Sequence, residues 1–189
     1  MELVSKEGQI VVRKEYANRE NCMRELHIYQ IIKGSLLPCA EILSEDANCV
    51  YMTYLPGETL VEILEAQEAA GKWDTLIWES LVDWLIGFHC HTGYSAVDVN
   101  LRNFLYDESA EILYGLDFEN CIEEELDITA SRLAAFIRTY SPEHTPMKQE
   151  IAEYVLKCFE KYLDMPLSRL HQKSLEQEAK LLERRKGRI

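Results

Sequence analysis

Two polar stretches in the middle of the chain hold residues suited to phosphate chemistry. The segment AVDVNLRN (96–103) places Asp98 five residues before Asn103, and the segment GLDFEN (115–120) places Asp117 directly after an apolar run. Mg²⁺ prefers carboxylate and amide oxygens, and a positioned carboxylate can take the proton of an acceptor hydroxyl. We interpret Asn103 and Asp117 as candidate metal ligands and Asp98 as a candidate base.

Each of these residues also has an ordinary explanation. Asp98 and Asn103 are residues that often shape loops, because their side chains bond to nearby backbone. Asp117 is harder to explain in this way. It follows Leu113, Tyr114 and Leu116, and an acid at the end of an apolar strand costs free energy unless something binds it.

The surrounding sequence predicts an α+β protein of two lobes. Residues 1–55 contain a hairpin around KEGQ, one helix stopped by Gly34, and two strands around SEDAN. Residues 56–189 predict helices over 59–70 and 73–92, a hairpin around DESAE, and three helices from Asp127 onward. We expect a β-rich N-lobe (1–55) and a mainly helical C-lobe (56–189), joined by a hinge near Pro56 and Gly57.

The motifs, taken in order, resemble the protein-kinase-like superfamily over nearly the whole chain. AVDVNLRN is similar to the catalytic loop of that superfamily, and GLDFEN to its metal-binding DFG element. VYMTYLPGETL (50–60) is similar to the hinge strand of the aminoglycoside- and choline-kinase-like branch. IVVRK (10–14) and RELHIYQII (24–32) resemble the strand and the helix that carry a paired lysine and glutamate. Each match alone is weak, but five in the right order are specific.

The resemblance implies an ATP- and Mg²⁺-dependent phosphotransferase that acts on a hydroxyl of a small molecule or a protein. Asp98 would be the catalytic base, with Asn103 and Asp117 on the metal. Lys14 would contact the α- and β-phosphates and Glu25 would hold Lys14. The nucleotide base would lie at Met52 and pair with the backbone of the hinge residues Thr53, Tyr54 and Leu55.

Several positions depart from the superfamily pattern. Ala96 stands where a histidine usually begins the catalytic loop, and Glu119 replaces the DFG glycine. Lys14 follows Met1 so closely that we expect no glycine-rich loop over the phosphates. Slow turnover is therefore expected, and two alternatives stay open. One is a pseudokinase that binds a nucleotide or a partner without catalysis, and the other is a slow ATPase that acts inside a complex.

The short segment between Asp117 and Asp127 has no room for the long activation segment of protein kinases. In this it resembles the RIO-type, lipopolysaccharide-core and aminoglycoside-type kinases, and Asp127 would match the helix acid that braces the catalytic loop. The acidic run Glu123 to Glu125 is either a solvated face or a bias toward cationic acceptors.

The composition bears on possible partners and on the cellular compartment. A net charge of −13 argues against general binding to nucleic acid. The tail KLLERRKGRI (180–189) is locally basic and is either a solvated helix end or a site for an anionic partner. Because it is short, charged and terminal, we expect it to be dispensable for folding. The six scattered cysteines, the absence of a signal sequence and the absence of a long apolar run favour a cytoplasmic protein without a membrane segment.

Overall fold

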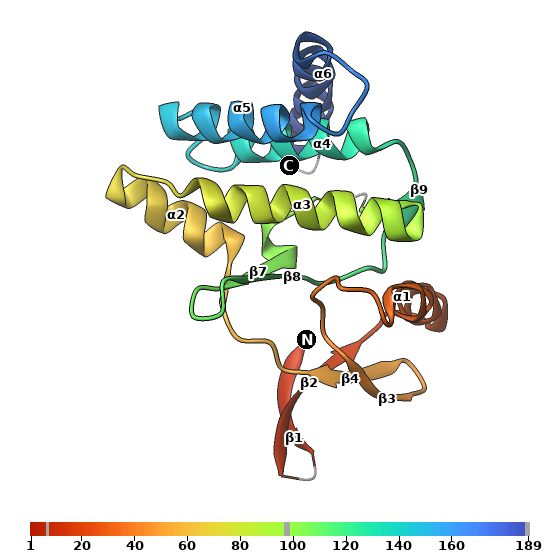
Figure 1. The fold of residues 1–189 in the computed structure, drawn as a ribbon. Helices are drawn as coiled ribbons and strands as arrows, with labels where there is room; N and C mark the ends of the chain where they lie inside the picture. The colour runs from red at the N-terminus through yellow and green to blue at the C-terminus, as the bar shows by residue number, and fades with distance from the viewer. Residues whose placement is uncertain (7, 97–98, 188–189) are drawn as a thin grey trace.

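The computed structural model describes residues 1–6, 8–96 and 99–187. The candidate base Asp98 lies outside the described residues. Figure 1 shows a twisted sheet and one helix in the lower part of the view, and a larger helical part above them. The expected α+β architecture, a small β-rich N-terminal part followed by a mainly helical C-terminal part, is confirmed.

The first sheet has the strand order β1-β2-β4-β3 and is antiparallel throughout. It comprises β1 (Glu2–Lys6), β2 (Gln9–Glu15), β3 (Ile42–Asp46) and β4 (Cys49–Thr53). Helix α1 (Arg19–Ile32) begins at Asn18, whose side chain accepts a hydrogen bond from the backbone N–H of Asn21 at 2.9 Å. Apolar residues of α1 and the sheet form a small core: Cys22, Leu26, Val50 and Met52.

Two amphipathic helices follow the connection between the lobes. Helix α2 (Leu60–Ala70) starts with a capping box between Thr59 and Glu62, and α3 (Thr75–Thr92) is capped by Asp74. Both helices end at a left-handed glycine, Gly71 and Gly93. Their apolar faces supply much of the large core.

Three small elements and a hairpin separate α3 from the last helices. The hairpin pairs β7 (Phe104–Asp107) with β8 (Ile112–Gly115), and β5 (Glu58–Thr59) extends this sheet. Strand β6 (Tyr94–Ala96) pairs with β9 (Cys121–Glu123), and a 3₁₀ turn, η1, covers Leu101–Asn103. The β6–β9 pair brings the start of the AVDVNLRN segment beside the residues that follow GLDFEN.

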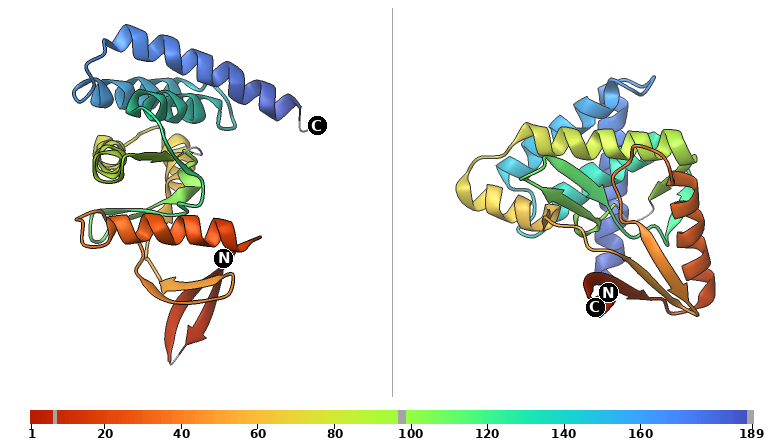
Figure 2. Two further views of the ribbon diagram at one scale, coloured as in Figure 1. Left: turned by 90° about the vertical axis from the view of Figure 1, so that its right-hand side faces the viewer. Right: turned by 60° about the horizontal axis from the view of Figure 1, so that its bottom comes forward.

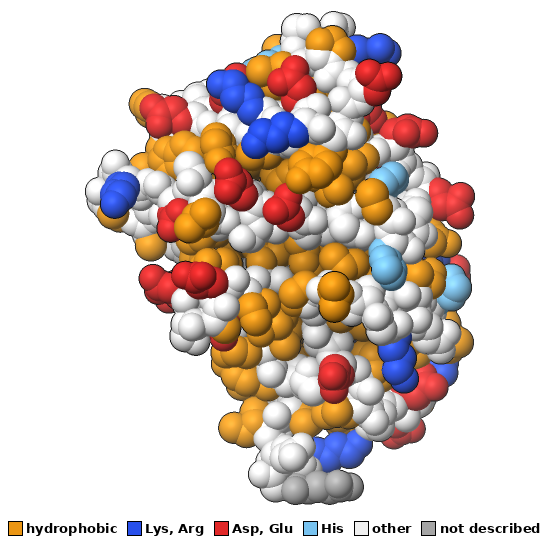
Figure 3. Space-filling view, viewed as in Figure 1, with side chains coloured by type: hydrophobic (Ala, Val, Ile, Leu, Met, Phe, Trp, Pro, Cys, Tyr) orange, Lys and Arg blue, Asp and Glu red, His pale blue; other side chains and the backbone are white. Residues whose placement is uncertain are grey.

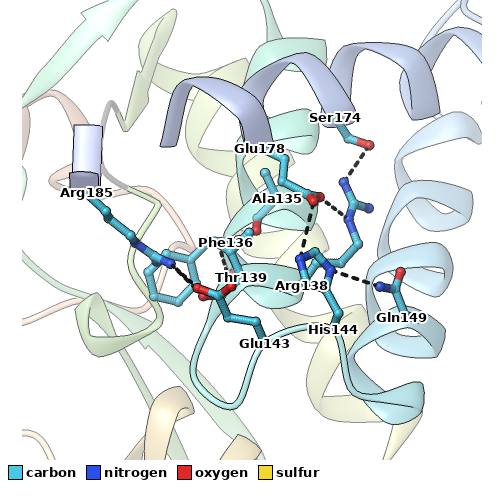
Figure 4. Close-up of polar contacts among 10 residues, drawn as sticks. All are labelled: Ala135, Phe136, Arg138, Thr139, Glu143, His144, Gln149, Ser174, Glu178 and Arg185. Atoms are coloured by element: carbon cyan, nitrogen blue, oxygen red, sulfur yellow. Dashed lines mark hydrogen bonds and ion pairs between the residues drawn. The ribbon is translucent and has the colours of Figure 1, made fainter. Parts of the chain in front are cut away.

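Helices α4 (Leu126–Thr139), α5 (Pro146–Glu160) and α6 (Leu167–Lys186) complete the fold. In the left view of Figure 2, α6 lies along α4 at the end of the molecule opposite the first sheet. Arg138 of α4, only 5% exposed, donates to Glu178 at 2.7 Å and to Ser174 at 2.9 Å on α6 (Figure 4). These contacts fasten α6 to the helical core.

The basic tail is part of this helix as far as Lys186. Arg185 donates to the backbone carbonyl of Thr139 at 2.6 Å and lies 3.5 Å from a carboxylate oxygen of Glu143 (Figure 4). One cation of the tail thus contacts the end of α4, and the prediction that residues 180–189 are dispensable for folding stays a prediction.

A close approach of three segments joins the two lobes. The carbonyl of Pro38 accepts hydrogen bonds from the indole N–H of Trp84 at 3.0 Å and from the backbone N–H of Gly115 at 3.2 Å. A Cβ atom on Gly115 would lie 2.1 Å from the Trp84 ring, so this position requires glycine. The loop after α1, helix α3 and strand β8 are thereby fixed relative to one another.

The predicted helices and hairpins are all present, whereas β5, β6 and β9 were not predicted. Each of these strands has two or three residues, too few to show an alternating pattern. None of the helices in the described part of the chain has the length and hydrophobicity needed to span a bilayer.

Candidate functional site

Lys14 is the centre of the candidate site and joins three distant segments. Its side chain comes from β2 and is 9% exposed. Its Nζ lies 2.5 Å from Oε2 of Glu25 on α1 and 2.8 Å from Oδ1 of Asp117, which follows β8. The structure thus brings together Lys14, Glu25 and Asp117, as the sequence motifs predict, although Glu25 could have paired instead with neighbouring Arg24 or Lys33.

Glu25 is held from two sides by the residues around it. Its side chain is 1% exposed, and its second oxygen, Oε1, accepts a hydrogen bond from the backbone N–H of Phe118 at 3.3 Å. The ammonium of Lys14 also lies 4.8 Å from the centre of the Tyr16 ring. A buried carboxylate with these partners is a fixed counterion for Lys14.

The segment that carries Asp117 has a specific backbone shape. Asp117 adopts a left-handed conformation with φ of 60°, which is uncommon outside glycine but is more frequent for asparagine and aspartate than for other residues. The residue before it, Leu116, donates its backbone N–H to the carbonyl of Asn103 at 2.8 Å. This backbone bond places Asn103 next to the residue that precedes Asp117, so the chain segments of the two candidate metal ligands are adjacent.

Phe118 anchors the same segment in the core. Its ring packs edge-on against Tyr29 of α1 at 5.0 Å between centres and stacks on Trp84 and Phe88 of α3 at 6.0 and 5.5 Å. One side chain thus connects α1 to α3 next to the polar site. Because it follows Asp117 directly, it restricts the direction in which that carboxylate can point.

The charges of the site change the ionisation of the groups in it. Burial alone would lower the pKa of Lys14, but the attraction of Glu25 and Asp117 outweighs it and the pKa is raised. Burial, followed by the nearby charges of Glu25 and Asp117, raises the pKa of the Cys121 thiol to about 12. Lys14 therefore stays an ammonium at neutral pH, and Cys121 stays a neutral thiol.

A third carboxylate faces the pair of acids. Oxygen atoms of Glu25, Asp117 and Glu119 lie within 4.8 Å of one another. Glu25 is committed to Lys14, whereas the Asp117 side chain is 29% exposed and can be reached from outside. Carboxylate oxygens gathered in this way are ligands that suit a hard cation such as Mg²⁺.

The expected hinge residues end β4 (Met52 and Thr53) or directly follow it (Tyr54 and Leu55). Met52 is 4% exposed in the small core, while Tyr54 is 52% exposed. Thr53 is already engaged, because its backbone N–H donates to the carbonyl of Glu41 at 3.0 Å and its hydroxyl accepts from the N–H of Glu41 at 2.9 Å. A nucleotide base that pairs with this segment would therefore use the backbone of Tyr54 or Leu55.

The loop that contains Asp98 is framed by described residues on both sides. Ala96 pairs with Cys121 in the β6–β9 ladder, and Val99 is 3% exposed in the large core. The side chain of Asn100 accepts from the backbone N–H of Arg102 at 3.0 Å and starts the turn that ends at Asn103. The residues on both sides of Asp98 thus have defined contacts, and Asp98 itself lies outside the described residues.

Two ion pairs next to this loop were not predicted from the sequence. Asp127, 5% exposed at the start of α4, pairs with Lys173 of α6, and Glu124 pairs with Arg132 at 2.5 Å. Nothing in the sequence near Lys173 indicates this contact, because the partners are far apart along the chain. Of the acidic run, Glu124 has a cation of its own and Glu123 closes β9.

Comparisons with known proteins leave the family open. No family model matches the chain, and no curated protein matches it. Among solved structures it is similar to WbdD bound to the kinase inhibitor LY294002, with a TM-score of 0.48, 16% identity, and coverage of 83% of this chain and 42% of that one. A second WbdD structure gives a TM-score of 0.47 and 15% identity, with coverage of 88% and 46%. The chain spans less than half the length of these structures, and at this similarity we transfer no residue role.

Proposed function

We propose that the chain binds ATP with Mg²⁺ and transfers a phosphoryl group to a hydroxyl. The observation that carries this proposal is the buried Lys14, held at 2.5 Å from Glu25 and at 2.8 Å from Asp117. A lysine fixed in this way presents a positive charge beside a carboxylate that can hold a metal. Phosphoryl transfer requires both, because the negative oxygens of the phosphates must be neutralised and positioned.

Each residue has a role within this proposal. Lys14 donates to the phosphates, and Glu25 holds its ammonium in place. Asp117 and Asn103 would hold the metal ion, which would supply positive charge against the phosphates when bound. Asp98 orients the acceptor hydroxyl and takes its proton. The backbone of Tyr54 or Leu55 pairs with the adenine base of the nucleotide.

A second function, binding without catalysis, is favoured by Glu119. This residue stands where the resemblance implies glycine, and it adds a carboxylate within 4.8 Å of Asp117 and Glu25. With three acids against Lys14, the site repels a nucleotide that arrives without metal. The chain would then bind a nucleotide or a partner and turn over slowly or not at all.

Substitution of Asp98 by asparagine separates the two functions. Asp98→Asn keeps the size and hydrogen-bonding capacity of the side chain and removes the base. For a phosphotransferase we expect unchanged nucleotide affinity and a fall in turnover of roughly 10²-fold or more. Turnover is measured as transfer of labelled phosphate to a panel of small-molecule and protein acceptors, with phosphate release to water followed in parallel.

The exposed acid Asp46 supplies a control, because Asp46→Asn makes the same chemical change at the end of β3. Equal transfer and equal phosphate release by wild type, Asp98→Asn and Asp46→Asn would exclude catalysis through this loop. Retained nucleotide binding in that case would leave the binding module as the function.

A further inference from the structure

A groove lies on the helical lobe, lined by α2, the α2–α3 turn and the β7–β8 turn, none of which carries a residue of the nucleotide site. Its volume is about 790 Å³, and its lining combines acidic with apolar and aromatic side chains, among them Glu58, Ile63, Trp73, Asp74, Tyr106 and Glu108. Figure 3 has the view of Figure 1. At the left edge of the molecule, at the level of the β7–β8 turn, it shows red acidic side chains beside orange hydrophobic surface. The volume is in the range of ligand-binding pockets.

The rim of the groove is acidic. Glu58, Asp74 and Glu108 are exposed, and Lys72 is the cation that lines the same groove. Asp74 uses one carboxylate oxygen to cap α3, where it accepts from the N–H of Leu76 at 2.9 Å. Glu58 and Glu108 form no ion pair with any residue of the described ranges 1–6, 8–96 and 99–187. Their charges are available to a cation from outside.

The floor of the groove is mainly apolar and aromatic. Ile63 is 8% and Tyr106 is 8% exposed, and the Trp73 ring is half-buried against Tyr154. The hydroxyl of Tyr106 forms no hydrogen bond with the part of the chain that the structure describes. Burial, and then the negative charges of Glu111, Asp74 and Glu108, raise the pKa of this phenol, so it stays neutral. A buried ring with an unpaired hydroxyl in an acidic groove is suited to a cationic donor.

We propose that this groove docks a segment of a partner protein that carries arginine next to an apolar side chain. The apolar side chain packs on Ile63 and Tyr106, and the guanidinium lies among Glu58, Asp74 and Glu108. A guanidinium has several N–H donors in one plane, so it can bond to a carboxylate and to the Tyr106 hydroxyl together, and it can stack on Trp73. Charge complementarity selects this occupant over an anionic or purely apolar one. The proposal does not depend on the proposed phosphotransferase activity.

The test uses a fluorescently labelled peptide of alternating leucine and arginine, and its binding to the full chain is measured by fluorescence anisotropy. We expect saturable binding that weakens with added salt, and much weaker binding of a peptide with glutamine in place of arginine. Glu108→Lys should weaken binding by at least about fivefold, because it removes one attraction and adds one repulsion. Tyr106→Phe keeps the ring and should weaken binding by about threefold through loss of one hydrogen bond.

A matched control separates docking from general attraction to an acidic protein. Glu41 is exposed on the other lobe, and Glu41→Lys makes the same change in net charge as Glu108→Lys. We expect Glu41→Lys to bind the peptide as wild type does. Equal weakening by the two substitutions, or equal binding of the glutamine peptide, would overturn the proposal. So would binding of arginine amide alone as tight as that of the peptide, since the groove would then serve a small cation.

Discussion

At the scale of single residues, the site depends on a lysine whose charge is almost completely removed from water. Lys14 and Glu25 are 9% and 1% exposed in their side chains. Such a pair gains little over two apolar residues, but each member is costly without the other. The pair therefore contributes a fixed charge more than it contributes stability, and the partly exposed carboxylate of Asp117 lies on the side from which this charge can be reached.

Removal of Lys14 should therefore destabilise the fold as well as any nucleotide complex. Lys14→Met leaves Glu25 buried without a cation, and we expect a loss of about 3 kcal/mol in the free energy of unfolding. The measurement is urea denaturation followed by circular dichroism. The double variant Lys14→Met with Glu25→Leu should recover much of the loss, because it leaves no unpaired buried charge.

Arg24→Met is the matched control for this prediction. Arg24 pairs with Glu20 on the exposed face of the same helix at 3.0 Å, so its loss should change stability by no more than about 0.5 kcal/mol. A Lys14→Met variant as stable as Arg24→Met would mean that Glu25 finds another partner or stays protonated in the fold.

At the scale of elements, the sequence predicts the parts of this fold that have a local signal. Helices α2 and α3 have caps and an apolar face, and the β7–β8 hairpin has two apolar runs around a polar turn. The two-residue β5 and the β6–β9 pair have no such signal, because they form only when distant segments meet. The same reason explains why Lys14 and Asp117 could be predicted through motifs, whereas Lys173 beside Asp127 and the Phe118 contacts could not.

The end of α6 provides a prediction at this scale. Arg185 donates to the Thr139 carbonyl at the end of α4 and lies near Glu143. A chain ending at Ala179 loses this charge-assisted bond, so we expect it to remain folded with a stability lower by about 2 kcal/mol. For a protein of this size that is a fall of roughly 4–8 °C in Tm, measured by differential scanning calorimetry.

The single substitution Arg185→Met should account for most of that fall. Lys180→Met is its control, since Lys180 is an exposed residue of the same helix. If truncation lowers Tm and Arg185→Met does not, the stabilisation comes from the length of the helix and not from this contact.

At the scale of the whole molecule, the two lobes meet at a junction built from backbone as much as from side chains. Gly57, on the connection between the lobes, has φ of 117°, and a Cβ atom there would lie 2.5 Å from the carbonyl oxygen of Tyr106. The Pro38 contacts to Trp84 and Gly115 join the loop after α1 to the helical lobe. Across this junction, Nζ of Lys14 lies 2.8 Å from the carboxylate of Asp117.

The overall charge of −13 and the three acids around Lys14 make a metal ion necessary for the proposed binding of ATP. A triphosphate alone adds negative charge to a negative site, whereas a triphosphate with Mg²⁺ brings the cation that Asp117 can hold. Binding of nucleotide should therefore depend on Mg²⁺, and that dependence should pass through Asp117.

Isothermal titration of ATP into wild type and Asp117→Asn, with and without Mg²⁺, tests this claim most directly, with Asp46→Asn as the control for the same change on an exposed strand end. We expect wild type and Asp46→Asn to bind ATP at least about tenfold more tightly with Mg²⁺ than without it, a difference of ~1.4 kcal/mol, and Asp117→Asn to lose this difference. Equal Mg²⁺-dependent binding by Asp117→Asn, or no binding of ATP by wild type, would contradict this claim.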